Sequence, residues 1–239
     1  METCKNCKTE VNLNYCPNCG HPTVLKRIDG QYILQEIRNV LNFEKGILFT
    51  IKELIISPGK NIQDFLHENR NRLVKPIVFL IVSSLIYSLL NNYFRIEDGY
   101  VNYAGNEESA KFTIFSWVQA NYGYANVIMA IFIGLWLKLF FRKSPFNFFE
   151  ILILLCFVMG MGMLIYSVFG VAESLINSNL MQFAAIVGFI YTTYAMGQFF
   201  DKRKFSSYVK SLFAYLLGMI TFSLAALLLG TILDLIIQK

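Results

Sequence analysis

Four cysteines near the start of the chain are the residues best suited to chemistry. Two residues separate Cys4 from Cys7, and two separate Cys16 from Cys19. Four thiolates with this spacing can close tetrahedrally on one zinc ion, and a closed set leaves no position open for a substrate. The sequence therefore predicts a structural zinc site in a ribbon over residues 1–22. Two disulfides are the alternative, although paired CxxC hooks are more typical of zinc sites.

Residues beside the cysteines bear on this prediction. Gly20 follows the second hook and permits the positive φ that turns a backbone N–H toward a sulfur, whereas Lys8 holds the matching position in the first hook. His21 could replace one of the four cysteines as a zinc ligand, but four sulfurs already fill the coordination sphere. Because a segment this short cannot bury a core, we expect bound zinc to supply the folding energy of the ribbon.

The rest of the chain carries no recognisable catalytic pattern. The segment 67–71 lacks the second histidine of an HExxH zinc motif, and no GxxxxGK[ST] phosphate loop is present. Cys156 lies in an apolar stretch, where we expect a small buried hydrophobe rather than a nucleophile. We therefore expect a protein that is not an enzyme. Glu2 and Glu10 dilute the N-terminal lysines, so we also expect no nucleic-acid partner.

Most of the chain beyond the cysteine segment is predicted to form apolar helices. Of the 239 residues, 55% are hydrophobic and 15% are charged, whereas an ordinary soluble domain is about 25% charged. A hydrocarbon core of about 30 Å needs about 20 apolar residues per helix. The stretches that meet this length are residues 76–94, 122–141, 148–170, 180–200 and 211–233. The sequence thus predicts an all-α membrane protein with a five-helix transmembrane bundle over residues 76–239, and a polar loop over residues 95–121.

Residues 23–75 are basic and amphipathic, and they connect the ribbon to the first span. Apolar residues recur at helical spacing over residues 33–41 and again over 47–55. Ser57–Lys60 is typical of a turn, and Asn61 could cap a third short helix. We expect cytosolic helices here, which could pack together, lie on the bilayer surface or cover the ends of the spans.

A second candidate site lies just before the first span. Lys60 lies in the predicted turn, and Arg70, Arg72 and Lys75 follow it. Together with the free N–H groups of a helix that begins near Asn61, these cations could bind an anionic lipid headgroup or another phosphate. The alternative is that they only set the orientation of the first span.

The basic residues also predict an orientation. Of the 21 lysines and arginines, eighteen lie before residue 76, in residues 138–143 or in residues 202–210, all on one side of the predicted spans. Arg95, Lys111 and Lys239 fall on the other side. Cytoplasmic segments carry the excess of Lys and Arg, and the cytosol also keeps thiols reduced. We therefore expect a cytoplasmic N-terminus and an external C-terminus.

Transport is the alternative function. Ion coupling usually needs ionisable groups near mid-membrane, whereas Lys138, Glu150, Asp201 and Asp234 all lie near the ends of predicted spans. A pore assembled from several copies would instead be lined by hydroxyl groups, and the residues that carry them are Ser83, Ser84, Tyr191, Thr192 and Thr193. The same groups could hydrogen-bond between helices. The glycines of the spans permit close helix contacts within one chain or in a homo-oligomer.

The segments CKNC, YCPNCG, SPGKNIQDFL and ENRNRLVKPIVFLIVSSLIY together resemble a family of uncharacterised bacterial multi-pass membrane proteins. That family combines an N-terminal Cys4 zinc ribbon, a Pro-Gly turn, a basic stretch that leads to a proline, and several helices. The resemblance covers residues 1–90 and implies this architecture in the bacterial cytoplasmic (inner) membrane. It implies no reaction.

Taken together, these features predict an integral membrane adaptor or scaffold. Its zinc ribbon would dock an unknown protein partner on the cytosolic side, and its basic segment would contact membrane lipids. The alternative is an oligomeric channel or a transporter-like protein.

Overall fold

The computed structural model describes residues 2–4, 7–11, 14–19, 46–94, 96, 110–176 and 180–237. The chain divides into two compact units, Met1–Leu41 and Asn42–Lys239. The predictions for Gly20, His21 and a helix over residues 33–41 lie outside the described residues.

The first unit contains a short antiparallel pair of strands. Strand β1 (Glu2–Thr3) pairs with β2 (Glu10–Val11), so that Glu2 lies opposite Val11 and Thr3 opposite Glu10. The pair brings the two ends of the first cysteine hook together. In the part of the chain that the structure describes, the regular elements outside this small sheet are helices.

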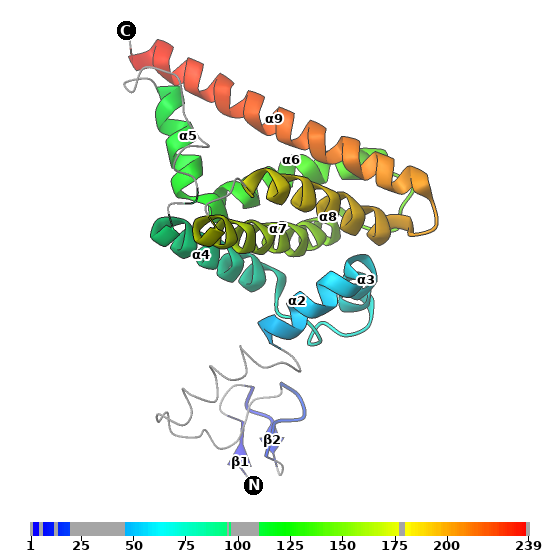
Figure 1. The fold of residues 1–239 in the computed structure, drawn as a ribbon. Coiled ribbons are helices and arrows are strands. Elements are labelled where there is room, and N and C mark those ends of the chain that lie inside the picture. Colours follow the sequence, from blue (N-terminus) through cyan, green and yellow to red (C-terminus); the bar gives the residue numbers. More distant parts are fainter. Residues whose placement is uncertain are drawn as a thin grey trace. The chain divides into compact units, whose positions relative to one another are not determined.

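The second unit is helical throughout its described residues (Figure 1). Two short helices come first, α2 (Ile47–Ile56) and α3 (Pro58–His67). The longer helices follow in the order α4 (Pro76–Phe94), α5 (Ala110–Ala120), α6 (Tyr122–Phe140), α7 (Phe148–Ile176), α8 (Met181–Asp201) and α9 (Phe205–Ile237).

Four of the described helices, α4, α7, α8 and α9, are long and apolar enough to cross a membrane. The apolar stretch of α6, Tyr124–Phe140, is shorter than these four. Large apolar side chains point outward from the four long helices, for example Ile81 and Leu85 on α4 and Leu228 and Leu229 on α9. Lipid is the solvent that such a surface requires. The chain is thus a membrane protein, and its fifth span stays a prediction.

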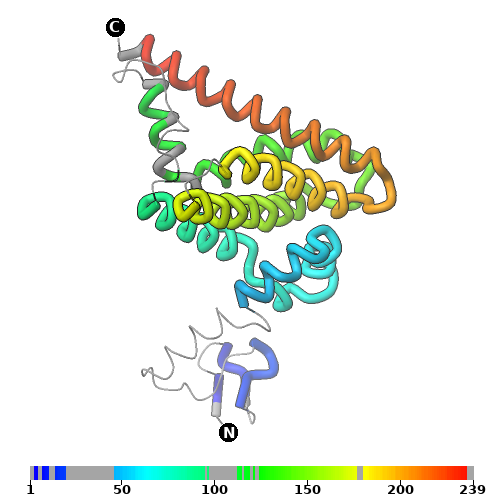
Figure 2. The backbone as a smooth tube through the Cα atoms, viewed as in Figure 1, coloured from blue at the N-terminus to red at the C-terminus, as the bar shows by residue number. Residues whose placement is uncertain are grey.

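Helix α5 corrects the prediction of a polar loop over residues 95–121. It occupies the end of that stretch and packs against α6 and α9. The helix forms because Ile114, Trp117 and Val118 provide apolar residues at helical spacing, and acidic residues upstream hide this pattern in the average composition. Figure 2 shows α9 reaching α5 near the C-terminal end of the chain.

Helix α7 lies at the centre of the second unit, with α4, α6 and α8 packed around it. Phe157 of α7 is fully buried, and its ring contacts the rings of Phe65 on α3 and Phe79 on α4 at centroid distances of 5.5 and 5.7 Å. A Cβ atom at Gly160 would lie 2.8 Å from the Phe79 ring. The small residue at this position therefore serves a close contact within one chain.

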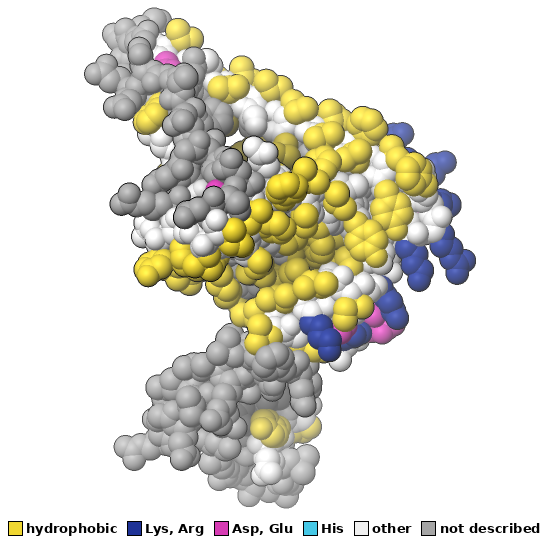
Figure 3. Space-filling view, viewed as in Figure 1, with side chains coloured by type: hydrophobic (Ala, Val, Ile, Leu, Met, Phe, Trp, Pro, Cys, Tyr) yellow, Lys and Arg dark blue, Asp and Glu magenta, His cyan; other side chains and the backbone are white. Residues whose placement is uncertain are grey.

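Lysines and arginines gather at one end of the second unit (Figure 3). The turns from α6 to α7 and from α8 to α9 meet there, because Phe141 stacks on Phe200 at 3.8 Å and Phe146 contacts Phe199 at 4.3 Å. The exposed cations of these turns are Arg142, Lys143, Lys202, Arg203 and Lys204. We call this region the basic end.

Candidate functional site

The four predicted metal ligands lie together in the first unit. All four sulfurs lie within 4.8 Å of one another; Cys4 lies 3.5 Å from Cys19, and Cys7 lies 3.4 Å from Cys16. Tetrahedral coordination with Zn–S bonds of about 2.3 Å separates sulfurs by about 3.8 Å, and the observed separations are close to this. None of the four forms a disulfide, because these separations are well beyond the roughly 2.05 Å of an S–S bond. The cluster therefore fits a metal ion better than two disulfides.

The backbone of the first hook adopts a tight turn that holds its two sulfurs. The Cys4 N–H donates to the Thr9 carbonyl at 2.8 Å, and the Lys8 N–H donates to the Cys4 carbonyl at 2.9 Å. Lys8 has a φ of 61°, in the left-handed region that favours glycine. The first hook thus forms the expected turn although it has lysine at the position that Gly20 holds after the second hook.

Cys7 is prepared electrostatically for metal binding. Its Sγ lies 3.3 Å from the Thr9 hydroxyl oxygen. Hydrogen bonds with the side chain and backbone of Thr9 lower the pKa of Cys7 to about 5. A lowered pKa favours the thiolate, which is the form that coordinates a metal. Cys4 and Cys16 are buried, so two of the four ligands are also shielded from water.

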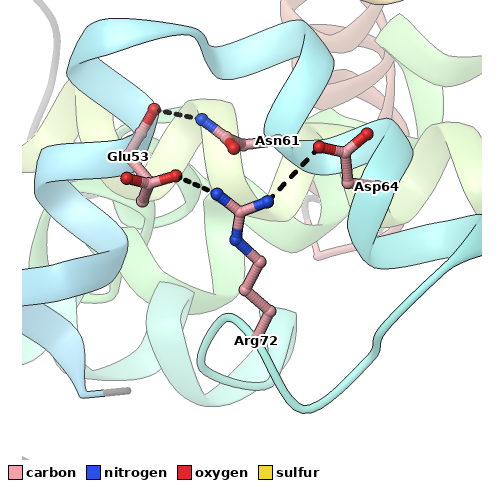
Figure 4. Close-up of polar contacts among 4 residues, drawn as sticks. All are labelled: Glu53, Asn61, Asp64 and Arg72. Carbon is pink, nitrogen blue, oxygen red and sulfur yellow. Dashed lines mark hydrogen bonds and ion pairs between the residues drawn. The ribbon is translucent and has the colours of Figure 1, made fainter. Parts of the chain in front are cut away.

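In the second unit, one arginine joins two helices and the loop that follows them (Figure 4). The Arg72 guanidinium bonds to Glu53 Oε2 of α2 at 2.5 Å and approaches Asp64 Oδ2 of α3 at 3.4 Å. Both carboxylates are 17% exposed, whereas Arg72 is 38% exposed. The Asn61 amide also donates to the Glu53 carbonyl at 2.8 Å. Arg72 therefore compensates charge inside the α2–α3 hairpin.

Helix α3 begins at Pro58, three residues before the predicted start near Asn61. Proline is favoured in the first turn, because its missing N–H would have no partner there. The prediction that Asn61 caps this helix is therefore wrong. The Asn61 side chain instead donates a hydrogen bond to the Glu53 carbonyl.

Helix α3 and the last turn of α8 are joined by hydrogen bonds. The Gly59 N–H in the first turn of α3 donates to Gln198 Oε1 at 2.7 Å, and the Gln63 amide donates to the Phe199 carbonyl in the last turn of α8. First-turn N–H groups and last-turn carbonyls lack partners within their own helices. This exchange gives both ends partners, so the Gly59 N–H at the start of α3 is not open to an anion.

The four cations of the predicted lipid site differ in their surroundings. Lys60, Arg70 and Lys75 are exposed, whereas Arg72 is paired inside the hairpin. Lys60 lies next to Gly59, which contacts the end of α8, so it adds to the basic end. Binding of an anionic headgroup by these residues stays a prediction, and Arg72 has a structural use of its own.

The hydroxyl groups proposed to line a pore lie inside the single chain. Ser83, Ser84 and Thr192 are buried, and the Tyr191 hydroxyl donates to the Leu54 carbonyl of α2 at 3.2 Å. The Tyr191 contact is of the kind that the interhelical alternative expects, whereas the buried Thr193 hydroxyl has no hydrogen-bond partner among the described residues.

The ionisable residues near the helix ends have local partners. Glu150 and Asn147 cap α7 reciprocally: the Asn147 N–H donates to Glu150 Oε2 at 2.7 Å, and the Glu150 N–H donates to Asn147 Oδ1 at 2.9 Å. This capping box could have been found from the Asn-x-x-Glu spacing. Lys138 likewise donates to the Phe146 carbonyl at 2.6 Å. These groups therefore organise the ends of helices.

Comparisons with known proteins give one match. Residues 44–88 match a family model described as a protein of unknown function (DUF3667). The matched stretch contains α2, α3 and the first two-thirds of α4, together with the Glu53–Asp64–Arg72 cluster. Neither the curated proteins nor the solved structures gave a match. The chain is thus similar to this family over the hairpin that leads into its first long helix.

Proposed function

We propose that this protein is a non-enzymatic membrane adaptor. Its first unit holds one structural zinc ion and docks a protein partner, while the helices of its second unit anchor it in the membrane. The observation that carries this proposal is the closed set of four sulfurs within 4.8 Å. Such a set leaves no coordination position for a substrate, so the metal would shape a binding surface.

The distribution of lysines and arginines in the second unit supports a cytosolic location for the first unit, at a bacterial cytoplasmic membrane. Exposed lysines and arginines gather at the basic end, and the connection between α7 and α8 contributes none. The positive-inside rule favours a cytosolic basic end. Lys60, Arg70 and Lys75 would then face anionic headgroups, each contributing about 1 kcal/mol near such a surface.

Metal analysis of the purified full chain tests the first step. We expect one zinc per chain, and we expect Cys16→Ser to lose it, because three sulfurs would remain in a site built for four. Cys156→Ser is the matched control, since Cys156 lies in α7 and takes no part in the cluster. A wild-type chain without stoichiometric metal would contradict the proposal.

Cross-linking in native membranes, followed by purification of the full chain, tests the docking step. We expect at least one protein to be recovered with the wild type and with Cys156→Ser, and to be lost with Cys16→Ser. Recovery of the same proteins with all three variants would mean that the ribbon is not the docking surface.

A further inference from the structure

Helix α2 has two apolar faces. One face packs inside the second unit through Ile47 and Leu54, which are 7% and 0% exposed. The other carries Leu48, Ile55 and Ile56, which are 41%, 62% and 63% exposed. At 3.6 residues per turn these three lie on one side of the helix, and Lys52 lies between them. A helix that is apolar on both sides does not normally face water.

Contacts with α8 and α7 place the α2–α3 hairpin beside helices that are long enough to cross a membrane. Tyr191, whose hydroxyl donates to the Leu54 carbonyl, is the middle residue of α8, about 15 Å from either end at 1.5 Å per residue. Phe65 of α3 contacts Phe157, about 14 Å along α7 from its start. The hairpin therefore runs beside the membrane-crossing helices and does not merely touch their ends.

Several polar groups of the hairpin have hydrogen-bond or ion-pair partners within the protein, as a position beside lipid requires. Lipid cannot hydrogen-bond a free backbone group. The Gly59 N–H bonds to Gln198, the Glu53 carbonyl bonds to Asn61, and Thr50 is bonded to the Gly46 carbonyl. The two partly buried carboxylates, Glu53 and Asp64, share the guanidinium of Arg72.

Helix α2 lies against the segment that leads into an apolar, exposed surface on α4. The Val74 N–H donates to the Thr50 hydroxyl at 3.0 Å, so α2 lies against the residues that immediately precede α4. Helix α4 begins with Ile77, Val78 and Ile81, which are all exposed. A lipid-facing surface on α4 thus begins next to α2.

We propose that α2 lies in the membrane interface, with its outer face against the bilayer beside the membrane-crossing helices. Leu48, Ile55 and Ile56 contact acyl chains, and Lys52 extends its ammonium group to the phosphates of the headgroups. Basic amphipathic helices bind bilayers in this way, and a lysine stem of four methylenes can lie along apolar surface while its charge stays in water. The ligand of this face is the lipid bilayer itself.

Tryptophan scanning with brominated lipid tests this proposal. Ile55→Trp and Ile56→Trp are made in the full chain, which is reconstituted in vesicles of phosphatidylcholine and phosphatidylglycerol with and without dibrominated acyl chains. The emission of wild-type protein, which contains Trp117 and Trp136, is subtracted. Glu68→Trp is the matched control, because Glu68 is exposed at the end of α3 where the chain leaves the hairpin.

We expect the added tryptophans at positions 55 and 56 to lose at least half of their emission to brominated lipid and to resist aqueous iodide. The tryptophan at position 68 should show the opposite pattern. Quenching of positions 55 and 56 by iodide would overturn the proposal in favour of a water-exposed helix. Resistance to both quenchers would overturn it in favour of a protein-covered face. Leu48→Trp, about two turns away on the same face, repeats the test independently. None of these outcomes depends on the metal site.

Discussion

Lys8 adopts a backbone conformation that is unfavourable for a lysine. Its φ of 61° is the conformation that glycine adopts freely, whereas other L-residues pay roughly 1–2 kcal/mol. The turn is nevertheless formed, because strand pairing on either side and the sulfur cluster determine it together. The first hook therefore holds backbone strain at Lys8.

Substitutions at Lys8 should change zinc affinity through this strain. We expect Lys8→Val to weaken zinc binding by about fivefold, equivalent to about 1 kcal/mol, because a β-branched side chain tolerates the left-handed region least. Lys8→Asn should bind zinc at least as tightly as the wild type does, since asparagine adopts this region more readily than lysine. Competition with a chromophoric chelator measures both. Equal affinities for Val and Asn would show that the conformation at position 8 does not limit binding.

Arg72 is the residue on which the charge balance of the hairpin depends. Arg72→Met would leave Glu53 and Asp64 facing each other at 17% exposure without a cation. We expect a loss of about 1–2 kcal/mol of stability, between the values for exposed and buried ion pairs. Thermal unfolding in detergent measures the change.

Two further variants separate charge balance from lost packing at Arg72. Arg70→Met removes an exposed cation from the same loop and should change stability little. Adding Glu53→Gln and Asp64→Asn to Arg72→Met should recover most of the loss, because no unpaired charge would remain. A triple variant as unstable as Arg72→Met alone would mean that the arginine acts by packing.

At the scale of elements, Gly59 sets how closely α3 approaches α8. A Cβ atom there would overlap backbone atoms of Gln198 and Phe199. We expect Gly59→Ala to destabilise the protein by about 1–3 kcal/mol, since backbone cannot move aside as a flexible side chain can. Denaturant or thermal unfolding of the purified chain measures the cost.

Gly162 provides a matched control for Gly59. It lies within α7, and among the described residues no atom lies within 4 Å of the position that its Cβ would take. Gly162→Ala should be neutral or should stabilise by up to about 1 kcal/mol, the difference in helix propensity between the two residues. If both alanine variants behave alike, close packing at Gly59 is not what holds α3 against α8.

The sequence predicts the elements well where a single local signal decides them. The cysteine cluster follows from spacing alone, and α4 occupies the residues predicted for the first span, because a long apolar run has few other conformations available. The start of α3 was misplaced, because Ser-Pro-Gly is equally typical of a turn and of a helix that begins with proline.

Contacts between distant residues could not be predicted in this way. Arg72 and Glu53 are 19 positions apart, and Gly59 and Gln198 are 139 apart. Neither pair has a periodic pattern that would join its members. The interaction appears only when the helices are placed, so Arg72 was grouped by its charge with Lys60, Arg70 and Lys75 rather than with its partners.

At the scale of the whole molecule, the division into two units predicts independent stabilities. The ribbon lies in the unit Met1–Leu41, and the long helices all lie in Asn42–Lys239. We expect removal of the metal with a strong chelator to unfold the ribbon, whose core is little more than its cysteines, and to leave helix content and the main thermal transition unchanged. Circular dichroism before and after chelation measures both. A fall of the main transition would show that the units are coupled.

The distribution of charge predicts the sides of the membrane on which the two termini lie. A reporter fused before Met1 should be active in the cytosol, and a reporter fused after Lys239 should be active only outside, because an odd number of spans follows from five helices with a cytosolic basic end. A C-terminal reporter active in the cytosol would contradict a span at α6, whose apolar stretch is shorter than the four long helices.

Helix α9 has one charged residue toward each of its ends and none between them. Lys210, whose ammonium lies 5.7 Å from the Phe141 ring centroid, and Asp234 are 24 positions apart, or about 36 Å along the axis. This length exceeds a hydrocarbon core of about 30 Å by only a few ångströms. Sliding the helix along its axis by two turns would draw one charge into lipid at a cost of about 3 kcal/mol. Piston movement is thus opposed at both ends, and any signal that α9 carries between the two faces must travel by tilting or by rotation about its own axis.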